Sequence, residues 1–265
     1  MDTHPTIRIA ANHRLSPLGE LPRYAGLLYF LVWRDVKVRY KQTALGVLWA
    51  ILQPAGIVAA ASLAFSRIAP HNVPYPLFVA AGVVPWQFFS RAVTDASVSP
   101  IENERLLTKV YFPRILLPLA AAVAVMVETS IAIVLLVLFV HIWSWHLLML
   151  IPALLIAVAT ATGIGAATAA MNVRYRDFRY MIPFLIQVMF LLTPVLYPPR
   201  AVPDKYRPIL ELNPLAGALE TVRWSLFGTG PLPHTFAYAL ITSLVLFVGG
   251  VWIFRAGEDA FADVI

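Results

Sequence analysis

Long stretches without a charged side chain set the strongest limit on how this chain can fold. Residues 44–66, 129–173 and 181–199 contain no Asp, Glu, Lys or Arg. A helix needs about 20 apolar residues to cross the roughly 30 Å hydrocarbon core of a bilayer. Every backbone polar group inside that core must be hydrogen-bonded within the protein. The sequence therefore predicts an all-α protein that crosses a membrane several times.

Composition agrees with this prediction and excludes several kinds of site. Hydrophobic residues make up 60% of the 265 residues and charged residues 13%, about half the charged fraction of a soluble domain. The net charge of +6 is explained by topology and contact with membrane lipids, so no nucleic-acid partner is expected. The chain has no cysteine, which excludes disulfides, thiolate metal sites and cysteine nucleophiles.

Apolar periodicity predicts six membrane spans. They are expected at about residues 44–66, 75–97, 115–140, 147–171, 181–197 and 236–254. Together they form a transmembrane domain at 44–254, which an amphipathic interfacial helix at 23–43 precedes. Residues 1–22 and 255–265 are expected to be cytoplasmic tails.

Basic residues orient these spans. The segment before the first span and the loops at 98–114 and 172–180 are rich in Lys and Arg, whereas the turn at 70–74 around Asn72 and the loop around Trp145 hold neither. Because Lys and Arg favour the cytoplasmic side of a membrane, both chain termini are expected there. The long segment 198–235 is then external. It departs mildly from the charge rule by carrying four basic residues: Arg200, Lys205, Arg207 and Arg223.

The helix expected before the first span is amphipathic. At 100° per residue Leu28, Val32 and Val36 share one face and basic residues share the opposite face, as in helices that lie in the membrane interface. Two roles remain open. The helix would be either an anchor that sets the topology or a basic entrance for an anionic lipid headgroup such as a pyrophosphate. The entrance residues would be Arg34, Lys37, Arg39 and Lys41.

A short cytoplasmic helix is expected at about 101–111. Ser99, Pro100 and Glu102 have the spacing of a capping box with Pro at the first helical position. One face of this helix would carry an apolar stripe, and the opposite face would be charged. The stripe would either dock on a partner protein, which we favour, or pack against the chain's own interfacial helix. The docking candidates are Glu102, Arg105, Leu106, Leu107, Lys109, Val110 and Tyr111.

Two helices are expected in the external segment, at about 203–227. Asn213 and Pro214 match the N-cap and first helical position of the second helix, and the glycines at 228 and 230 end it. These two helices would approach the membrane and turn back. They would form either a gate over the space that the spans enclose or a simple pair of helices in the membrane interface. The gate candidates are Asn213, Pro214, Glu220, Arg223 and Trp224.

Polar and aromatic side chains inside or beside the spans are candidates for a translocation path. Glu128 lies near the middle of the third span, where a charge costs at least ~3 kcal/mol unless it is neutralised, paired or facing water. A protonated glutamic acid that joins two helices and a functional carboxylate both remain open. The path candidates are Trp49, Gln53, Trp86, Glu128 and Gln187.

Motifs for catalysis are absent from the sequence. It contains neither Gly-x-x-x-x-Gly-Lys-Ser/Thr nor His-Glu-x-x-His. We therefore expect no catalytic residue, no metal ligand and no cofactor in this chain. A membrane enzyme that processes lipid-linked sugars is the alternative from another class. It would need surface carboxylates, and the positions of Asp177, Glu102 and Glu104 are better explained by capping and ion pairing.

Four linked motifs resemble the polysaccharide-export permeases of the type-2 ABC exporters. They occur in family order from about residue 34 to residue 228. The first is RDVKVRYKQT at 34–43, followed by LGVLW at 45–49 and QP at 53–54. The others are KVYFPR at 109–114, NVRYRD at 172–177 with PF at 183–184, and NPL at 213–215 with Glu220 and Arg223-Trp224.

The resemblance implies a homodimer of six-span subunits in the inner membrane of a bacterium. Each subunit would pair with a separate cytoplasmic P-loop ATPase, which would hold the ATP and Mg²⁺. The substrate would be a glycan on a polyprenyl diphosphate, of the O-antigen, capsule or teichoic-acid type. In this family the coupling helix corresponds to 101–111 and the gate to about 203–227. An exporter of another amphipathic substrate with the same fold remains the alternative.

Overall fold

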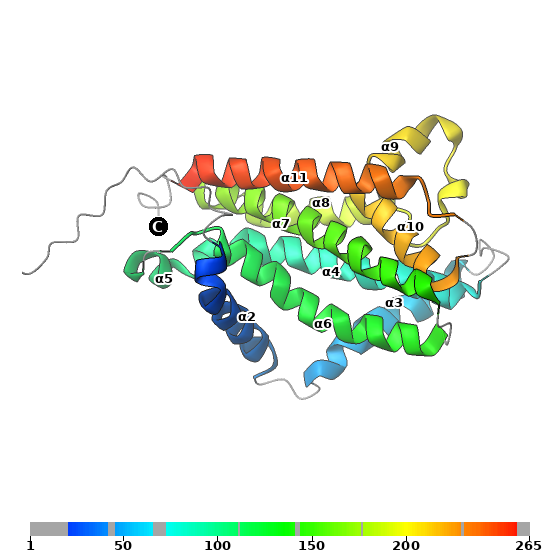
Figure 1. Cartoon of the computed structure of the whole chain (residues 1–265), viewed down its shortest axis with the longest axis horizontal. Helices are drawn as coiled ribbons and strands as arrows, with labels where there is room; N and C mark the ends of the chain where they lie inside the picture. The colour runs from blue at the N-terminus through cyan, green and yellow to red at the C-terminus, as the bar shows by residue number, and fades with distance from the viewer. Residues whose placement is uncertain are drawn as a thin grey trace, which may run out of the picture.

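The computed structural model describes residues 21–41, 46–65, 73–110, 112–140, 144–175, 177–228 and 231–258, and all regular elements in these ranges are helical. The long helices run side by side and make an elongated bundle (Figure 1). They are α4 (Tyr75–Glu102), α6 (Leu116–Val140), α7 (Leu150–Arg174) and α11 (Thr235–Glu258). Two shorter apolar helices are α3 (Trp49–Phe65) and α8 (Phe178–Leu192).

Short elements gather at the two ends of the bundle (Figure 1). One end holds α5 (Glu104–Lys109) and the end of α11, with α2 (Ala25–Tyr40) crossing the bundle there. The other end holds α9 (Arg207–Glu211) and part of α10 (Pro214–Phe227). The remaining short turns are 3₁₀-helical: η1 (Leu21–Tyr24), η2 (Gly46–Leu48), η4 (Trp145–Met149), η5 (Pro199–Ala201) and η6 (Asp204–Tyr206).

Four helical segments are long and apolar enough to cross a bilayer within the described ranges: α4, α6, the continuous run from η4 into α7, and α11. The first and fifth expected spans correspond to α3, with 17 residues, and α8, with 15. At 1.5 Å per residue the described parts of these two helices are roughly 26 and 22 Å long, against about 30 Å for the hydrocarbon core.

The end of the fifth expected span was wrong. We expected it to reach residue 197, but α8 ends at Leu192. Thr193 adopts an extended conformation, with φ −91° and ψ 140°, because a residue that precedes proline is disfavoured in the helical region. The Pro194 that causes this lies inside the apolar run, so hydropathy alone gave no sign of the break.

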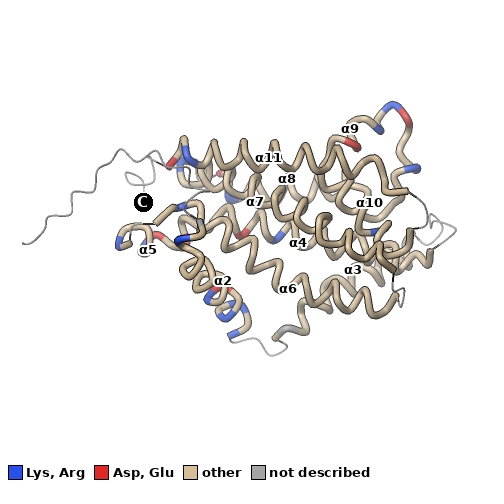
Figure 2. Tube along the Cα trace, viewed as in Figure 1, with Lys and Arg blue, Asp and Glu red and all other residues tan. Residues whose placement is uncertain are grey.

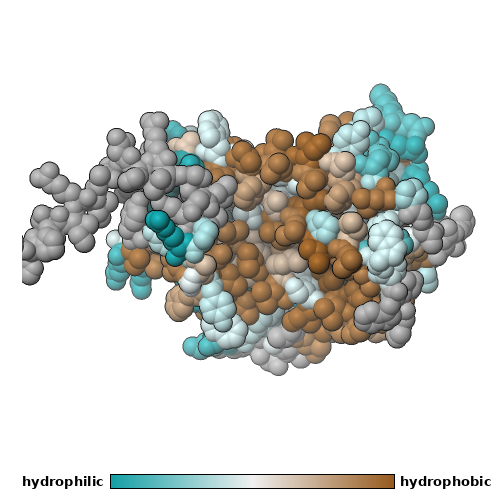
Figure 3. All heavy atoms as spheres, in the orientation of Figure 1, coloured by the Kyte–Doolittle hydropathy of each residue, from teal (hydrophilic) through white to brown (hydrophobic). Residues whose placement is uncertain are grey.

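Charge and hydropathy divide the bundle along its length. Lys, Arg, Asp and Glu gather mainly at α2, α5, the end of α11 and the segment before α9 (Figure 2). Between these ends the visible surface is largely apolar (Figure 3). A bilayer requires this division, because charged groups are expensive in its core and stable at its interfaces.

The helices α7 and α11 cross at two glycines. A Cβ on Gly250 would clash with the carbonyl oxygen of Gly163, and a Cβ on Gly163 would clash with the backbone at Leu246. Small residues allow this approach and give the extensive backbone contact that joins helices in membranes.

We expect Gly250→Ala to separate α7 from α11 and to lower the midpoint of thermal unfolding in detergent. Overpacking of this kind typically costs about 1–3 kcal/mol. The matched control is Gly249→Ala, whose Cβ would meet nothing within 4 Å. It should keep or raise the midpoint, because alanine loses less backbone entropy than glycine on folding. Equal midpoints for the two variants would contradict the close crossing.

Candidate functional site

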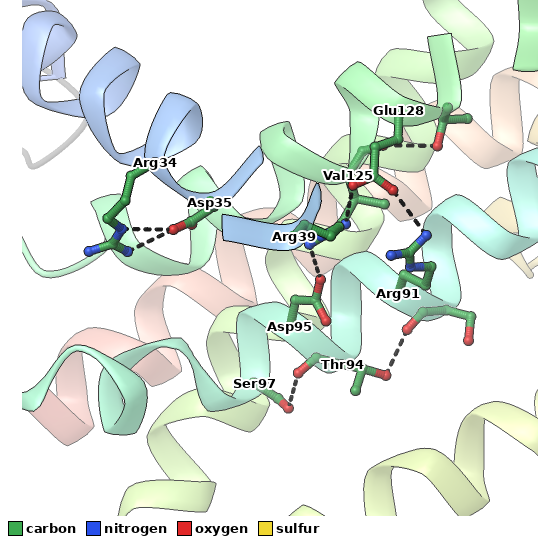
Figure 4. A network of polar contacts seen from close by, with 11 residues as sticks. Arg34, Asp35, Arg39, Arg91, Thr94, Asp95, Ser97, Val125 and Glu128 are labelled. Atoms are coloured by element: carbon green, nitrogen blue, oxygen red, sulfur yellow. Dashed lines mark hydrogen bonds and ion pairs between the residues drawn. The ribbon is translucent and has the colours of Figure 1, made fainter. Parts of the chain in front are cut away.

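An ion-pair network joins α2, α4 and α6 (Figure 4). The carboxylate of Glu128 in α6 is 5% exposed and contacts two arginines. Its Oε1 lies 2.7 Å from Nη1 of Arg39 in α2, and its Oε2 lies 2.9 Å from Nη1 of Arg91 in α4. Arg39 also donates from Nη2 to Oδ2 of Asp95 in α4, at 2.6 Å. The four side chains, here called the α2 network, carry two positive and two negative formal charges.

The α2 network explains how a carboxylate is tolerated inside the third span. An unpaired buried charge costs several kcal/mol, and pairing with well-placed hydrogen bonds offsets that cost. Arg39 gives Glu128 both an ion pair and a hydrogen bond, and Arg91 gives it a second ion pair. Each oxygen of the Glu128 carboxylate therefore faces a guanidinium group.

Tyr40 adds a neutral donor to the α2 network. Burial raises the pKa of its hydroxyl, and the negative charge of Glu128 and a hydrogen bond to that carboxylate raise the pKa further. The hydroxyl therefore keeps its proton at neutral pH and donates to Glu128. Two side chains from the last turns of α2, Arg39 and Tyr40, thus hold the same carboxylate of α6.

A small cavity adjoins the α2 network between α3, α4 and α6. Its lining includes Gln53 of α3, Gln87 and Arg91 of α4, and Glu128 and Thr129 of α6. The cavity volume is about 20 Å³, which is room for little more than one water molecule. Gln53 of α3 therefore lines the same cavity as Arg91 and Glu128 of the α2 network. The cavity is too small for a sugar ring.

The other path candidates lie elsewhere. Trp49 is about half exposed at the start of α3, and Gln187 lies on the exposed face of α8. Trp86 is buried, and its ring packs against Phe89 and Phe190 at centroid distances of 5.5 Å. Of the five path candidates, only Gln53 and Glu128 therefore line the same cavity in the structure.

The four expected entrance residues occupy different environments. Arg39 points into the bundle and is held by the α2 network. Arg34 pairs with its neighbour Asp35 at 2.7 Å, and Lys37 lies 5.3 Å from the ring centroid of Trp33. Lys37 and Lys41 are exposed. The part of this basic face available to a ligand is therefore smaller than the sequence predicts.

The expected capping box was wrong. The hydroxyl of Ser99 donates to the carbonyl of Ala96 within α4 at 2.8 Å, so Ser99 does not begin a helix. α4 continues through Pro100 to Glu102, and α5 begins at Glu104. The expected coupling segment 101–111 thus spans the end of one helix and a second short helix. A Ser-Pro-x-Glu pattern cannot distinguish a helix start from the interior of a long helix.

The apolar stripe of α5 packs inside the protein. Leu106 and Leu107 are half-buried and join a cluster that combines Leu31 of α2 with Leu116 of α6. The stripe thus packs against the chain itself, on a cluster that includes the interfacial helix, which is close to the arrangement that we considered less favoured than docking. The expected docking residues that remain exposed are mainly polar: Glu102, Arg105, Lys109 and Val110. Tyr111 lies outside the described residues.

The expected gate helices differ in burial. α9 is largely exposed, whereas α10 is buried along nearly its whole length and packs against α4, α7 and α11. Asn213 caps α10 by accepting from the Leu215 N–H at 3.0 Å, and Pro214 follows at the first helical position. Glu220 accepts a hydrogen bond from the Thr235 hydroxyl at 2.6 Å, which ties α10 to α11.

Arg223 fixes α10 to the turn after α8. Its guanidinium donates to the carbonyls of Pro194 at 2.7 Å and Val195 at 2.6 Å, and it lies 3.7 Å from the ring centroid of Phe78. The neighbouring Trp224 packs edge-on against His146 at 4.5 Å. The charged and aromatic residues of α10 therefore hold this helix in the bundle.

Arg91 and Asp95 are the functional candidates that our sequence analysis missed. Both lie in the expected second span, and they are four residues apart, so they share one face of α4. Charges inside a span are rare and normally paired. Two charged residues on one face of the second expected span, together with Glu128 in the third, therefore indicate an ion-pair network between these helices.

Comparison with known proteins supports one family. Residues 26–227 match the family described as ABC-2 type transporter. An O-antigen export system permease protein RfbA from Klebsiella pneumoniae is 31% identical over 246 residues, which cover 90% of this chain and 95% of that protein. A protein of the same name from Myxococcus xanthus is 31% identical over 256 residues, which cover 93% of this chain and 98% of that protein.

We expect Arg39→Gln and Glu128→Gln to be coupled in a double-mutant cycle. Each single change leaves a buried charge with one partner fewer, so unfolding in detergent micelles should reveal a coupling energy of about 0.5–3 kcal/mol. The control cycle pairs Glu128→Gln with Arg34→Gln, because Arg34 contacts Asp35 instead of Glu128. That cycle should be additive within about 0.5 kcal/mol. Additivity in both cycles would show that the α2 network contributes no direct pairing.

Proposed function

Because the chain belongs to the ABC-2 type transporter family, we propose that it is the permease subunit of an ATP-driven polysaccharide exporter in the inner membrane of a bacterium. The observation that carries this proposal is the similarity, over 90% or more of the chain, to proteins named as O-antigen export permeases. The cargo would be a glycan carried on a polyprenyl diphosphate. ATP and Mg²⁺ would be bound by a separate subunit, since this sequence has no P-loop.

Two copies of the chain would enclose the export path. α3 and α8 supply the argument, because both are apolar and carry large exposed apolar residues, such as Leu52 on α3 and Phe184 and Leu185 on α8. Contact with a second copy would cover these faces. Gln187 on the exposed face of α8 and Trp49 at the start of α3 would then lie near the boundary between the copies.

The ATPase would act on the permease through α5 and α2. The exposed side of α5 offers Arg105 and Lys109 to a partner, while Leu106 packs on the cluster that α2 forms with α6. α2 is joined to α4 and α6 by Arg39, and α3 follows it along the chain. A push on α5 would therefore reach α3 and α4 through one rigid element.

The substrate would enter beside α2 and leave beside α9. Lys37 and Lys41 are exposed on α2, and a basic residue near an anionic surface contributes about 1 kcal/mol to binding. At the opposite end the exposed α9 would move as a gate over the buried α10. Asn213 and Arg223, which anchor α10 at its two ends, would provide the fixed side of that gate.

A membrane enzyme is the less favoured function. The carboxylates of Asp95 and Glu128 are paired with arginines. Within the described ranges, no three His, Asp or Glu side chains are close enough to hold a metal ion. Carboxylates available for acid–base or metal-assisted chemistry are therefore scarce in this part of the chain.

Co-purification tests the proposal. The tagged chain should be recovered with a P-loop ATPase, and lipid extracted from the complex should contain a glycan on a polyprenyl diphosphate. The double variant Arg105→Glu, Lys109→Glu should release the ATPase, since charge reversal at a contact costs several kcal/mol. Lys205→Glu, a charge reversal at the opposite end of the bundle, is the control and should keep the complex intact. Recovery of the chain without any ATPase, or of a complex whose extracted lipid includes no glycan on a polyprenyl diphosphate, would contradict the proposal.

A further inference from the structure

A second cavity lies at the α9 end of the bundle, between α8, α9 and the start of α10. Its volume is about 550 Å³, within the range of about 300–1,000 Å³ that is usual for ligand sites. Its wall includes Leu192 of α8, Ile209 and Leu210 of α9, and Leu215 of α10. It also reaches Leu246 in α11. The proposed export mechanism makes no use of this space.

Most polar side chains of the cavity wall are already bonded within the protein. Thr160 donates to the carbonyl four residues earlier in its own helix, at 2.8 Å. The side chain of Asn213 bonds Thr193 and the first turn of α10, and the hydroxyl of Tyr197 donates to carbonyls at the end of α8. A buried water needs two to four polar partners, which this wall does not offer. The cavity therefore suits a hydrocarbon.

The lining of the cavity extends from the short helix α9 to the middle of α11. Ile209 lies in α9, and Leu246 lies eleven residues into α11, counted from Thr235. At 1.5 Å per residue Leu246 is about 16 Å along α11 from its first residue, which is about half of a 30 Å hydrocarbon core. An apolar ligand that reaches Leu246 from α9 would thus lie beside the apolar middle of α11, as a lipid tail does.

Two basic residues are close in sequence to residues that line the cavity. Lys205 lies 5.7 Å from the ring of Tyr206, which is one of the lining residues. Arg200 is exposed two residues before Val202, another lining residue. Neither Lys205 nor Arg200 forms an ion pair within the described parts of the chain, whereas Arg207 pairs with Asp204 at 2.7 Å. These charges are among the external basic residues that topology leaves unexplained.

We propose that the cavity binds one hydrocarbon tail of an anionic lipid in the outer leaflet, with the lipid phosphate at Lys205 and Arg200. A membrane phospholipid and a polyprenyl phosphate both combine a hydrocarbon tail with a phosphate group. The inference rests on the proposed function for the outward orientation of α9. The bound tail fills the space between α8 and α9, so it determines how closely the exposed helix approaches the bundle.

Photo-labelling of the full-length protein in nanodiscs tests the tail. The probe is phosphatidylglycerol with a diazirine near the end of its acyl chain. Labelled peptides should contain the end of α8 and the middle of α11. Leu246→Trp fills the cavity and should reduce this labelling to background. The matched control is Leu244→Trp on the same helix, because Leu244 is exposed and does not line the cavity; it should keep the labelling.

The headgroup is tested with the same readout. Arg200→Gln with Lys205→Gln should lower labelling by about tenfold, and Arg207→Gln, which removes a paired charge, should leave it unchanged. A phosphatidylcholine probe should label only weakly. Competition by polyprenyl phosphate identifies the carrier as the source of the tail, and its failure to compete identifies a phospholipid.

Two results would overturn the inference. One is equal labelling of the Leu246→Trp and Leu244→Trp variants. The other is cross-linking of a photoreactive residue at Ile209 to a second copy of the chain instead of to lipid. Labelling requires neither ATPase nor transport. A negative result therefore leaves the co-purification test of the proposed function intact, and a failure of that test leaves the labelling interpretable.

Discussion

The contacts of Arg39 with Asp95 and Glu128 support the arrangement of the whole α2 end of the bundle. A carboxylate in α6 is tolerated because two guanidinium groups face it, and one of these belongs to α2. α2 is thus held on the bundle by charge at its last turn and by Leu31 near its middle. Those two attachments fix where α2 lies, and Leu106 and Leu107 of α5 pack against the cluster that α2 forms with α6.

This arrangement gives each end of the bundle a different kind of attachment. At the α2 end, ion pairs in and beside the spans join three helices, and the small cavity brings Gln53 of α3 to the same place. At the α9 end, Arg223 donates to backbone carbonyls and thereby secures a buried helix beside an apolar cavity. In the proposed exporter, force from the ATPase would enter at the α2 end and the export path would open at the α9 end.

Sequence alone predicted the helical class, the positions of the four long apolar helices and the cap of α10, because runs without charge and the pair Asn213-Pro214 act locally. It did not separate Arg39 from its basic neighbours, because a helical wheel shows which residues share a face but not which segment that face contacts. The partners Arg91 and Asp95 were visible as charges within an expected span and were overlooked. The burial of α10 and the packing of α5 against the cluster of α2 and α6 depend on contacts between segments far apart in the chain, and periodicity does not reveal such contacts.

The most direct test is the distance between α2 and the bundle. Because the chain has no cysteine, spin labels on Lys37→Cys and Val134→Cys, both exposed positions, report one distance between α2 and α6. The ion pairs predict a single narrow distance distribution in the otherwise native chain and a broad one when Glu128→Gln is added. Equally narrow distributions in the two proteins would show that α2 is held without these ion pairs.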